Sequence, residues 1–388
     1  MEERLLGGYE GFKGGVMVPA SSLRSSVKLL SLYRFEMGPI RPPSEGGSYS
    51  LLVRVTRNCP WSKCTFCYGT PYNRERFQVR LVGEVKADID AVKLMCDELK
   101  MLSKMLGYSG EVNEGLASTL LVEAPELTLN PCFVTVFNWL SSGAKTVFLQ
   151  DADSLIMRTE QLVEVVKYLK TVFPRLERIT SYARAKTLAR KPFEELKALR
   201  RAGLVRLHVG LETGDDELLR MVNKGVTSEE QVEAGRKTVE AGFELSEYVM
   251  PGLGGRDRWR EHAENTAKVL NRINPHYVRM RTLVPRPGTP LYEDYVKGRF
   301  KLLSPHEILR EIKALIERLD VESRVCFDHF CNPSYRVKGG FVAPLFRQGY
   351  EGYKLPEEKD EILRAVDFGL SMEESRFVRV EELINMPL

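Results

Sequence analysis

The chain has 388 residues, of which 43% are hydrophobic and 28% are charged, and its formal net charge is +4 at pH 7. This composition is ordinary for a globular protein and excludes wholesale disorder, a collagen-like repeat and a small disulfide-stapled scaffold. No apolar run approaches the ~18 residues that span a bilayer, and the acidic N-terminus lacks the apolar region of a signal peptide. The sequence therefore predicts a cytoplasmic protein without a membrane partner.

The first part of the chain divides into an extension and a long repeating region. Residues 1–48 contain clusters of Gly, Pro and Ser and are predicted to wrap around the main domain as an N-terminal extension. Within residues 49–295, short β-branched runs alternate with amphipathic stretches, which predicts βα units around a parallel sheet. The predicted strands are 51–56, 145–149, 177–182, 204–211, 243–249 and 276–281. The predicted helices between them are 81–106, 158–170, 192–202, 227–242 and 258–272.

Six such units fit two α/β architectures, a doubly wound sheet or an incomplete (β/α)6 barrel. The pattern changes after Pro285, where a proline-rich loop leads into further amphipathic stretches. Helices are predicted near 289–297, 304–319 and 357–367, with loop-rich sequence before the last of them. Residues 296–388 are therefore predicted to form a mostly helical and loop-rich C-terminal cap.

Polar side chains share one face of several predicted strands, because successive side chains of a strand point to opposite sides. Arginines occupy this face repeatedly: Arg54, Arg206, Arg279 and Arg281. A packed barrel interior uses bulky aliphatic side chains instead, so an arginine-lined lumen predicts a cavity for a polar or anionic ligand. The alternative is a set of buried Arg–Glu pairs that serve only the fold. Arg41 and Glu45 of the extension could also reach this lumen.

The seven cysteines are an odd number with uneven spacing, which argues against a disulfide framework. Cys59, Cys64 and Cys67 lie close together directly after the first predicted strand. Three thiolates on one loop can bind three irons of a [4Fe–4S] cluster and leave the fourth iron open. A structural zinc site would need a fourth ligand, and the next Cys or His along the chain is Cys96. The spacing therefore favours a cluster over zinc.

Together with the βα series, this loop resembles the radical S-adenosylmethionine (radical SAM) superfamily. The usual signature is C-x3-C-x2-C with an aromatic residue before the last cysteine, as Phe66 is here, although this chain has C-x4-C at the first gap. Further segments resemble motifs of the superfamily and of its Elp3/MiaB-like branch: 148–153, 181–184, 210–214 with 224–225, 249–255 and 285–292. The resemblance covers about residues 50–295 and implies a partial (β/α)6 TIM-like barrel without a cobalamin domain.

The resemblance implies an oxygen-sensitive enzyme in which Cys59, Cys64 and Cys67 hold a [4Fe–4S] cluster. Such an enzyme cleaves S-adenosylmethionine (SAM) reductively to a 5′-deoxyadenosyl radical, which abstracts hydrogen from a substrate. The substrate is not identified by the sequence, and the arginines favour a polar or anionic one. A reductant such as flavodoxin or ferredoxin is implied as a partner.

Candidate SAM contacts follow from the same motifs. Arg184 is predicted to pair with the SAM carboxylate, and Glu212 to accept from the ribose hydroxyls or to fix that arginine. The alternative is structural, with Arg184 at a helix start and Glu212 in an ion pair of the lumen. The remaining candidate cofactor contacts are Phe66, Gln150, Asp151, Asp153, Gly252 and Gly254.

In the C-terminal cap, Asp328, His329 and Asn332 form a dense polar group. His329 is predicted, with Arg279 and Arg281, to act in catalysis, by donating a proton or binding substrate, or else to hold the cap in place. Four cysteines lie outside the first loop: Cys96, Cys132, Cys326 and Cys331. Cys326 and Cys331 could ligate a second cluster with one of the others, but small buried residues are the favoured interpretation.

Two other function classes stay open. One is an RNA- or protein-modifying radical SAM enzyme, and the other is an iron–sulfur protein for electron transfer or sensing that never binds SAM. Residues 167–206 contain twelve Lys or Arg against three Asp or Glu, but aromatic residues are not interleaved as in RNA-binding patches. Solvated helix faces explain this run more simply, so nucleic acid is not the favoured partner.

Overall fold

The computed structural model describes residues 20–45, 49–67 and 75–386. Residues 1–19 and 46–48 of the predicted extension lie outside these ranges, as do Tyr68 and Gly69 after the cysteine loop. The described part is an α/β structure in which one large sheet has the order β1-β4-β5-β6-β7-β8-β9-β12. The strands are β1 (Ser50–Arg54), β4 (Thr146–Gln150), β5 (Arg178–Ala183), β6 (Leu204–Glu212), β7 (Glu244–Val249), β8 (Tyr277–Met280), β9 (Arg324–Cys326) and β12 (Tyr353–Lys354).

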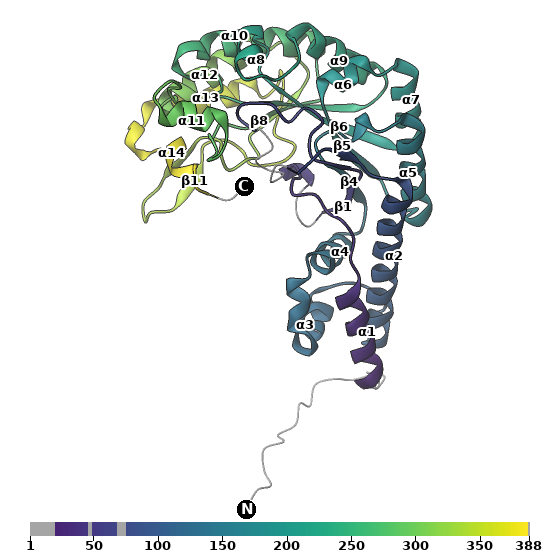
Figure 1. Ribbon diagram of the computed structural model, residues 1–388. Helices are drawn as coiled ribbons and strands as arrows, with labels where there is room; N and C mark the ends of the chain where they lie inside the picture. The colour runs from purple at the N-terminus through teal and green to yellow at the C-terminus, as the bar shows by residue number, and fades with distance from the viewer. Residues whose placement is uncertain (1–19, 46–48, 68–74, 387–388) are drawn as a thin grey trace, which may run out of the picture.

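Neighbouring strands from β1 to β9 pair in parallel, and β12 pairs antiparallel with β9. The two end strands of this order, β1 and β12, do not pair, so the sheet is an open, partial barrel (Figure 1). The predicted partial barrel is therefore confirmed. The barrel has one more parallel strand than predicted, β9. The sequence does not predict this strand because it spans only three residues, too few to show a period.

Helices cover the outside of the barrel (Figure 1). They are α2 (Val82–Met105), α5 (Thr159–Val172), α6 (Ala185–Arg190), α7 (Phe193–Ala202), α8 (Asp216–Met221), α9 (Ser228–Glu240) and α10 (Gly255–Ile273). The C-terminal part adds α11 (Pro290–Val296), α12 (Pro305–Arg318), α13 (Lys359–Ser371), α14 (Val380–Leu383) and the hairpin of β10 (Ser334–Arg336) and β11 (Val342–Pro344). In the described residues, no helix is both long and apolar enough to cross a membrane.

Local sequence sets the helix ends. Thr227 is the N-cap of α9, where its hydroxyl accepts from the amide of Glu230 and the Glu230 carboxylate accepts from the amide of Thr227. Ser304 and Glu307 form the same capping box at α12. Gly203, with φ of 120°, ends α7 in a conformation that favours glycine. These ends agree with the predicted helices to within a few residues.

The sequence does not predict a group of three helices, one before β1 and two between α2 and β4. Its members are α1 (Ala20–Leu32), α3 (Glu114–Glu123) and α4 (Pro131–Ser141), which pack with one end of α2 and project away from the barrel (Figure 1). In α3, Leu116 and Leu120 are buried while Val122 is 82% exposed. Apolar residues on both faces weaken the period that identifies an amphipathic helix.

The lumen is closed at the amino ends of its strands by Glu45, which lies in the short 3-10 helix η1 (Pro43–Glu45) and is fully buried. Ser50 donates a hydrogen bond of 2.8 Å to its carboxylate. The same carboxylate lies 3.4 Å from Arg178, 3.9 Å from Arg206 and 3.5 Å from the Nε2 atom of His208. Glu45 thus reaches the lumen as expected, whereas Arg41 is exposed.

An aromatic layer lies above this closed end. The ring of Phe148 meets that of Tyr182 edge-on at 5.1 Å between centroids, and His208 lies 6.0 Å from both Tyr182 and Tyr248. These residues come from four neighbouring strands, β4 to β7. The layer separates the ion pairs at the amino ends from the space at the carboxyl ends.

Candidate active site

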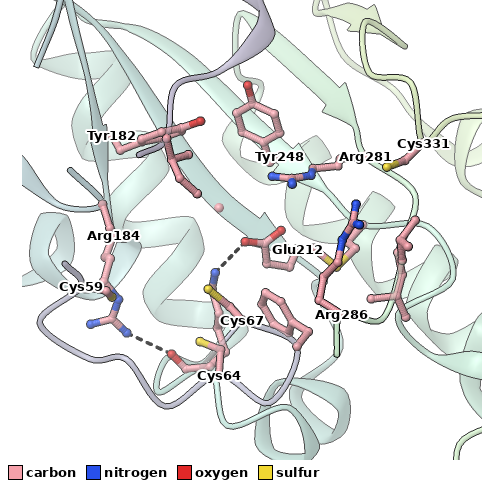
Figure 2. Close-up of a pocket in the computed structure, with 18 of the residues that line it drawn as sticks. Cys59, Cys64, Cys67, Tyr182, Arg184, Glu212, Tyr248, Arg281, Arg286 and Cys331 are labelled. Carbon is pink, nitrogen blue, oxygen red and sulfur yellow. Dashed lines mark hydrogen bonds and ion pairs between the residues drawn. The ribbon is translucent and has the colours of Figure 1, made fainter. Parts of the chain in front are cut away.

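A cavity of about 230 Å³ lies at the carboxyl ends of the barrel strands (Figure 2). Its wall includes residues at or just after the ends of β4, β5, β6, β7 and β8: Ala152, Arg184, Glu212, Met250 and Arg281. Parallel α/β folds bind ligands at this edge because the loops there are free to vary. The aromatic layer forms the floor, since Tyr182 and Tyr248 also line the cavity.

Cys59, Cys64 and Cys67 all line one side of this cavity, together with Phe66 (Figure 2). The loop that carries them is held at its start by Asp151, whose carboxylate accepts from the amide of Asn58 at 2.9 Å. The same carboxylate accepts from the guanidinium of Arg54 at 2.6 Å. Asp151 therefore joins the end of β1 to the cysteine loop.

The remainder of the loop docks onto neighbouring segments. The amide of Thr65 donates to the carbonyl of Val222 at 2.9 Å, and the carbonyl of Thr65 accepts from the amide of Leu291 at 3.0 Å. The indole of Trp61 donates to the carbonyl of Asn223 at 2.7 Å. Contacts at three points fix the path of the loop.

The three thiols fit a [4Fe–4S] cluster by their chemistry and by their surroundings. Within the described ranges, no three Cys, His, Asp or Glu side chains converge on a point that would suit one metal ion. A cluster needs no such convergence, because each thiolate binds a separate iron. Burial raises the pKa of Cys64, and raises that of Cys67 to about 12, so cluster binding must displace protons from these thiols.

Glu212 and Lys224 form an ion pair of 2.8 Å in the middle of the cavity wall (Figure 2). Burial opposes the charge of Lys224, but the Glu212 carboxylate beside it outweighs burial and raises the pKa of Lys224. Gly210 makes room for this pair, since a Cβ atom there would lie 2.3 Å from a Glu212 oxygen. The pair supplies a fixed dipole beside the cysteines.

Arg184 lines the cavity on the same side as the cysteines. Its guanidinium donates to the carbonyl of Lys224 at 3.0 Å and lies 5.4 Å from the centroid of the Trp61 ring. Asp153 is fully buried and accepts from the amide of Arg184 at 3.2 Å and from the hydroxyl of Thr187 at 2.5 Å. Asp153 therefore orients the chain at Arg184 rather than lining the cavity itself.

Other predicted cofactor contacts also lie behind the cavity wall. The side-chain amide of Gln150 binds the backbone of Gly38 and Ile40, and Ile40 in turn lines the cavity. Gly252, with φ of 88°, donates its amide to both carboxylate oxygens of Glu311 at 3.1 Å. Gly254 precedes α10 as its N-cap. The structure thus places Phe66, Arg184 and Glu212 at the cavity and the other five predicted contacts behind its wall.

The three predicted catalytic residues lie in different settings. Arg281 lines the cavity. Arg279 is fully buried outside it, in an ion pair with Asp328 and in hydrogen bonds of 3.1 Å to Ser246 and to a backbone carbonyl. His329 accepts from the amide of Cys331 at 3.2 Å, which fits the alternative that it holds the cap in place.

Several cavity residues are absent from the prediction. They are Tyr182, Lys224, Tyr248, Arg286 and Cys331, among others. Strand alternation could have found Tyr248, because it shares the lumen face of β7 with Ser246. No sequence signal places Cys331, which comes from the cap, beside strands of the barrel. The other three cysteines, Cys96, Cys132 and Cys326, are buried away from the cavity lining.

Comparison with known proteins finds a family match within the barrel. Residues 138–268 match the family described as the Radical SAM superfamily. The match confirms the predicted resemblance to the radical SAM superfamily for this part of the barrel. It supports the expectation of a radical SAM enzyme with a [4Fe–4S] cluster and SAM as cofactors. Similarity to Elongator complex protein 3, below, agrees with the predicted branch.

Among curated relatives, human Elongator complex protein 3 is 24% identical over 231 residues, which cover 58% of this chain and 38% of that protein. The heme chaperone HemW of Bacillus subtilis is 29% identical over 160 residues, 41% of each chain. The chain thus spans about two fifths of the length of these relatives. Among solved structures, coproporphyrinogen III oxidase HemN of Escherichia coli matches with a TM-score of 0.42 and 16% identity, covering 76% of this chain and 56% of that one.

Proposed function

We propose that this chain cleaves SAM reductively at a cluster held by Cys59, Cys64 and Cys67 and acts on a polar substrate in the adjoining cavity. The observation that carries this proposal is the shared wall, where three thiols lie beside one partly buried ion pair and a further arginine. When bound, the cluster and SAM would supply a 5′-deoxyadenosyl radical that abstracts hydrogen from an unactivated carbon.

The chain's own residues would bind and orient. Arg184 is placed to bind the SAM carboxylate, because stacking on Trp61 and the bond to the Lys224 carbonyl fix its plane and leave other guanidinium N–H groups available. Glu212 is placed to accept hydrogen bonds from the ribose, with Lys224 fixing its position. The aromatic layer beneath them excludes water from the lumen side.

An RNA substrate is less well supported by this surface. Part of the charge in the basic run is neutralised, because five of its twelve basic residues pair with carboxylates. The ion pairs are Arg178–Glu45, Lys186–Glu230, Lys191–Glu195, Lys197–Glu194 and Arg206–Glu244. A surface that binds phosphates needs unpaired Lys and Arg, and these ion pairs reduce their number, so we favour a small molecule in the cavity. Retention of bulk tRNA by this protein on a filter would instead support the RNA-modifying alternative.

The proposal is tested by anaerobic reconstitution of the full chain with iron and sulfide, followed by reduction and addition of SAM. The native protein should show the visible absorbance of an iron–sulfur cluster and release 5′-deoxyadenosine. A variant with Cys59→Ala, Cys64→Ala and Cys67→Ala should lose both, because it lacks all three thiolate ligands. Cys132→Ala is the matched control, since Cys132 is buried on α4 outside the cavity lining.

Two results would contradict the proposal. One is a cluster that persists in the triple variant, since the ligands would then lie elsewhere. The other is a native cluster that yields no 5′-deoxyadenosine and whose electron paramagnetic resonance spectrum does not change when SAM is added. That outcome would favour an electron-transfer or sensing role.

A further inference from the structure

We propose that Arg281 and Arg286 form a binding site for an oxyanion, a carboxylate or a phosphate, of the substrate. This inference rests on the proposed function and specifies the class of molecule that would share the cavity with SAM. Figure 2 shows the two guanidinium groups directed into the same part of the cavity, close to Cys331 and away from Arg184 and Cys59. The cavity therefore has a second basic side in addition to the one beside the cysteine loop.

The charges of these two arginines lack partners. Among the described residues, no carboxylate forms an ion pair with Arg281 or Arg286, and no hydrogen bond from the Arg281 guanidinium is found. The Nη1 atom of Arg286 donates to the carbonyls of Leu383, Ile384 and Met386, at 3.3, 3.2 and 2.6 Å. Its Nη2 atom is buried and has no hydrogen-bond partner. A buried donor on a charged group costs free energy unless something accepts from it.

The positive charges of Arg281 and Arg286 lower the pKa values of neighbouring groups. Burial lowers the pKa of Arg286, the neighbouring Cys331 opposes this shift, and the charge of Arg281 lowers the pKa further. Burial also lowers the pKa of His329 to about 3, with the charges of Arg281 and Arg286 acting in the same direction. The two arginines therefore repel each other and suppress a third positive charge nearby. An oxyanion between them would relieve this repulsion.

No side chain of the cavity can supply the missing negative charge. Glu212 is the carboxylate among the lining residues that the structure describes, and Lys224 already neutralises it. Three other arginines of the lumen have a structural role, because each is paired with a carboxylate. Arg54 binds Asp151, Arg206 binds Glu244, and Arg279 binds Asp328. Arg281 and Arg286 differ because no carboxylate among the described residues pairs with their guanidinium groups.

The geometry also separates this site from the one proposed for SAM. Arg184 lies beside the cysteine loop, whereas Arg281 and Arg286 follow β8 near the cap (Figure 2). Arg286 joins the C-terminal segment to the cavity through its Nη1 atom, while its buried Nη2 atom has no hydrogen-bond partner. A ligand bound there would contact the barrel and lie close to the cap. A planar fork such as guanidinium binds an oxyanion through two parallel hydrogen bonds.

The test measures binding without turnover, by isothermal titration calorimetry on the full chain with its cluster reconstituted. Succinate and inorganic phosphate are the two anionic probes, and neutral succinamide is the matched control for succinate. We expect at least one anion to bind and succinamide not to bind. Arg281→Gln should weaken anion binding about 10- to 100-fold, as loss of a charged hydrogen-bond partner does. Which anion binds more tightly then distinguishes a carboxylate site from a phosphate site.

Two further variants keep the result interpretable. Arg281 makes no described contact that the fold needs, so Arg281→Gln should fold normally. Arg286→Gln should weaken binding of the same anion. The unfolding midpoint of this variant is measured as well, because Arg286 also binds the C-terminal segment. Arg220→Gln is the control, since that side chain is 72% exposed on α8. The affinity for SAM should change less than about 2-fold in Arg281→Gln.

The inference is overturned if neither anion binds the native protein, or if Arg281→Gln binds the anion as tightly as the native protein does. It is also overturned if Arg281→Gln loses SAM affinity but keeps anion affinity, because Arg281 would then serve SAM. If an anion binds through Arg281 but no 5′-deoxyadenosine forms and SAM does not change the electron paramagnetic resonance spectrum, the oxyanion site stands and the proposed function fails.

Discussion

The closed end of the lumen contains basic groups whose charges are matched, and the open end contains two arginines whose charges are not. At the closed end, buried Glu45 lies within ion-pair distance of Arg178 and Arg206. At the open end, Arg281 and Arg286 face the cavity without a carboxylate partner among the described residues. Buried charge is costly, so a matched group stabilises the fold, whereas an unmatched group indicates a ligand.

The largest expected difference is in stability. Asp328→Ala would leave Arg279 buried without its carboxylate partner, and we expect it to lower the free energy of unfolding by about 3–5 kcal/mol. Arg281→Ala removes a side chain without a described partner and should change that free energy by less than about 0.5 kcal/mol. Urea unfolding monitored by circular dichroism measures both values under one condition.

Asp328→Asn is the conservative control, because it keeps the shape and one hydrogen-bond acceptor while removing the charge. The free energy of unfolding of Asp328→Asn should lie between those of the native protein and Asp328→Ala. Equal losses of stability in Arg281→Ala and Asp328→Ala would show that the two arginines are not in different settings. The comparison between the two ends would then be wrong.

The closed end should also respond to acid. Burial lowers the pKa of His208 to about 4, although Glu45 opposes this shift. The unfolded chain therefore binds a proton at His208 below about pH 6.5, while the folded chain does so only near pH 4. The stability contributed by this residue is fully present above pH 6.5, is lost progressively as the pH falls from 6.5, and is exhausted near pH 4. Between pH 7 and 4, His208→Gln should lose about 2 kcal/mol less unfolding free energy than the native protein.

The measurement is urea unfolding at several pH values, with the two proteins compared at each. Glutamine keeps a donor for Glu45 but does not titrate in this range. His306→Gln serves as the control, because His306 lies on α12 and does not take part in the lumen network. Parallel pH profiles for the native protein and His208→Gln would show that His208 does not carry this dependence.

The sequence predicts the barrel well because period-2 and period-3.6 patterns identify strands and helices directly. The six predicted strands all exist, and the three clustered cysteines lie on one side of the cavity. The same alternation places Arg54, Arg206, Arg279 and Arg281 on equivalent faces. It cannot tell which of them is paired, because each partner lies far away in the chain. Asp151 is 97 residues from Arg54, and Asp328 is 49 residues from Arg279.

For a related reason, only some of the predicted cofactor contacts line the cavity, while the others lie behind its wall. Motif resemblance finds segments near a site, but it does not say which side chain points inward. In the segment 148–153, Asp151 and Asp153 hold the cysteine loop and Arg184, while Ala152 between them lines the cavity. Cys331 of the cap and Arg286 of the segment after β8 lie on loops, which have no hydrophobic period. Tertiary structure alone places them.

The smallest expected effect concerns the aromatic layer between the two ends. The hydroxyl of Tyr248 is buried and has no hydrogen-bond partner, whereas the hydroxyl of Tyr277 accepts from Arg206 at 3.3 Å and donates to Glu351 at 3.2 Å. Tyr248→Phe removes an unsatisfied polar group and should raise the free energy of unfolding by about 1 kcal/mol. Tyr277→Phe removes two hydrogen bonds and should lower it by about 1 kcal/mol. Thermal unfolding of the pair gives the sign of each effect, and a loss of stability in Tyr248→Phe would mean that its hydroxyl already has a partner in the lumen.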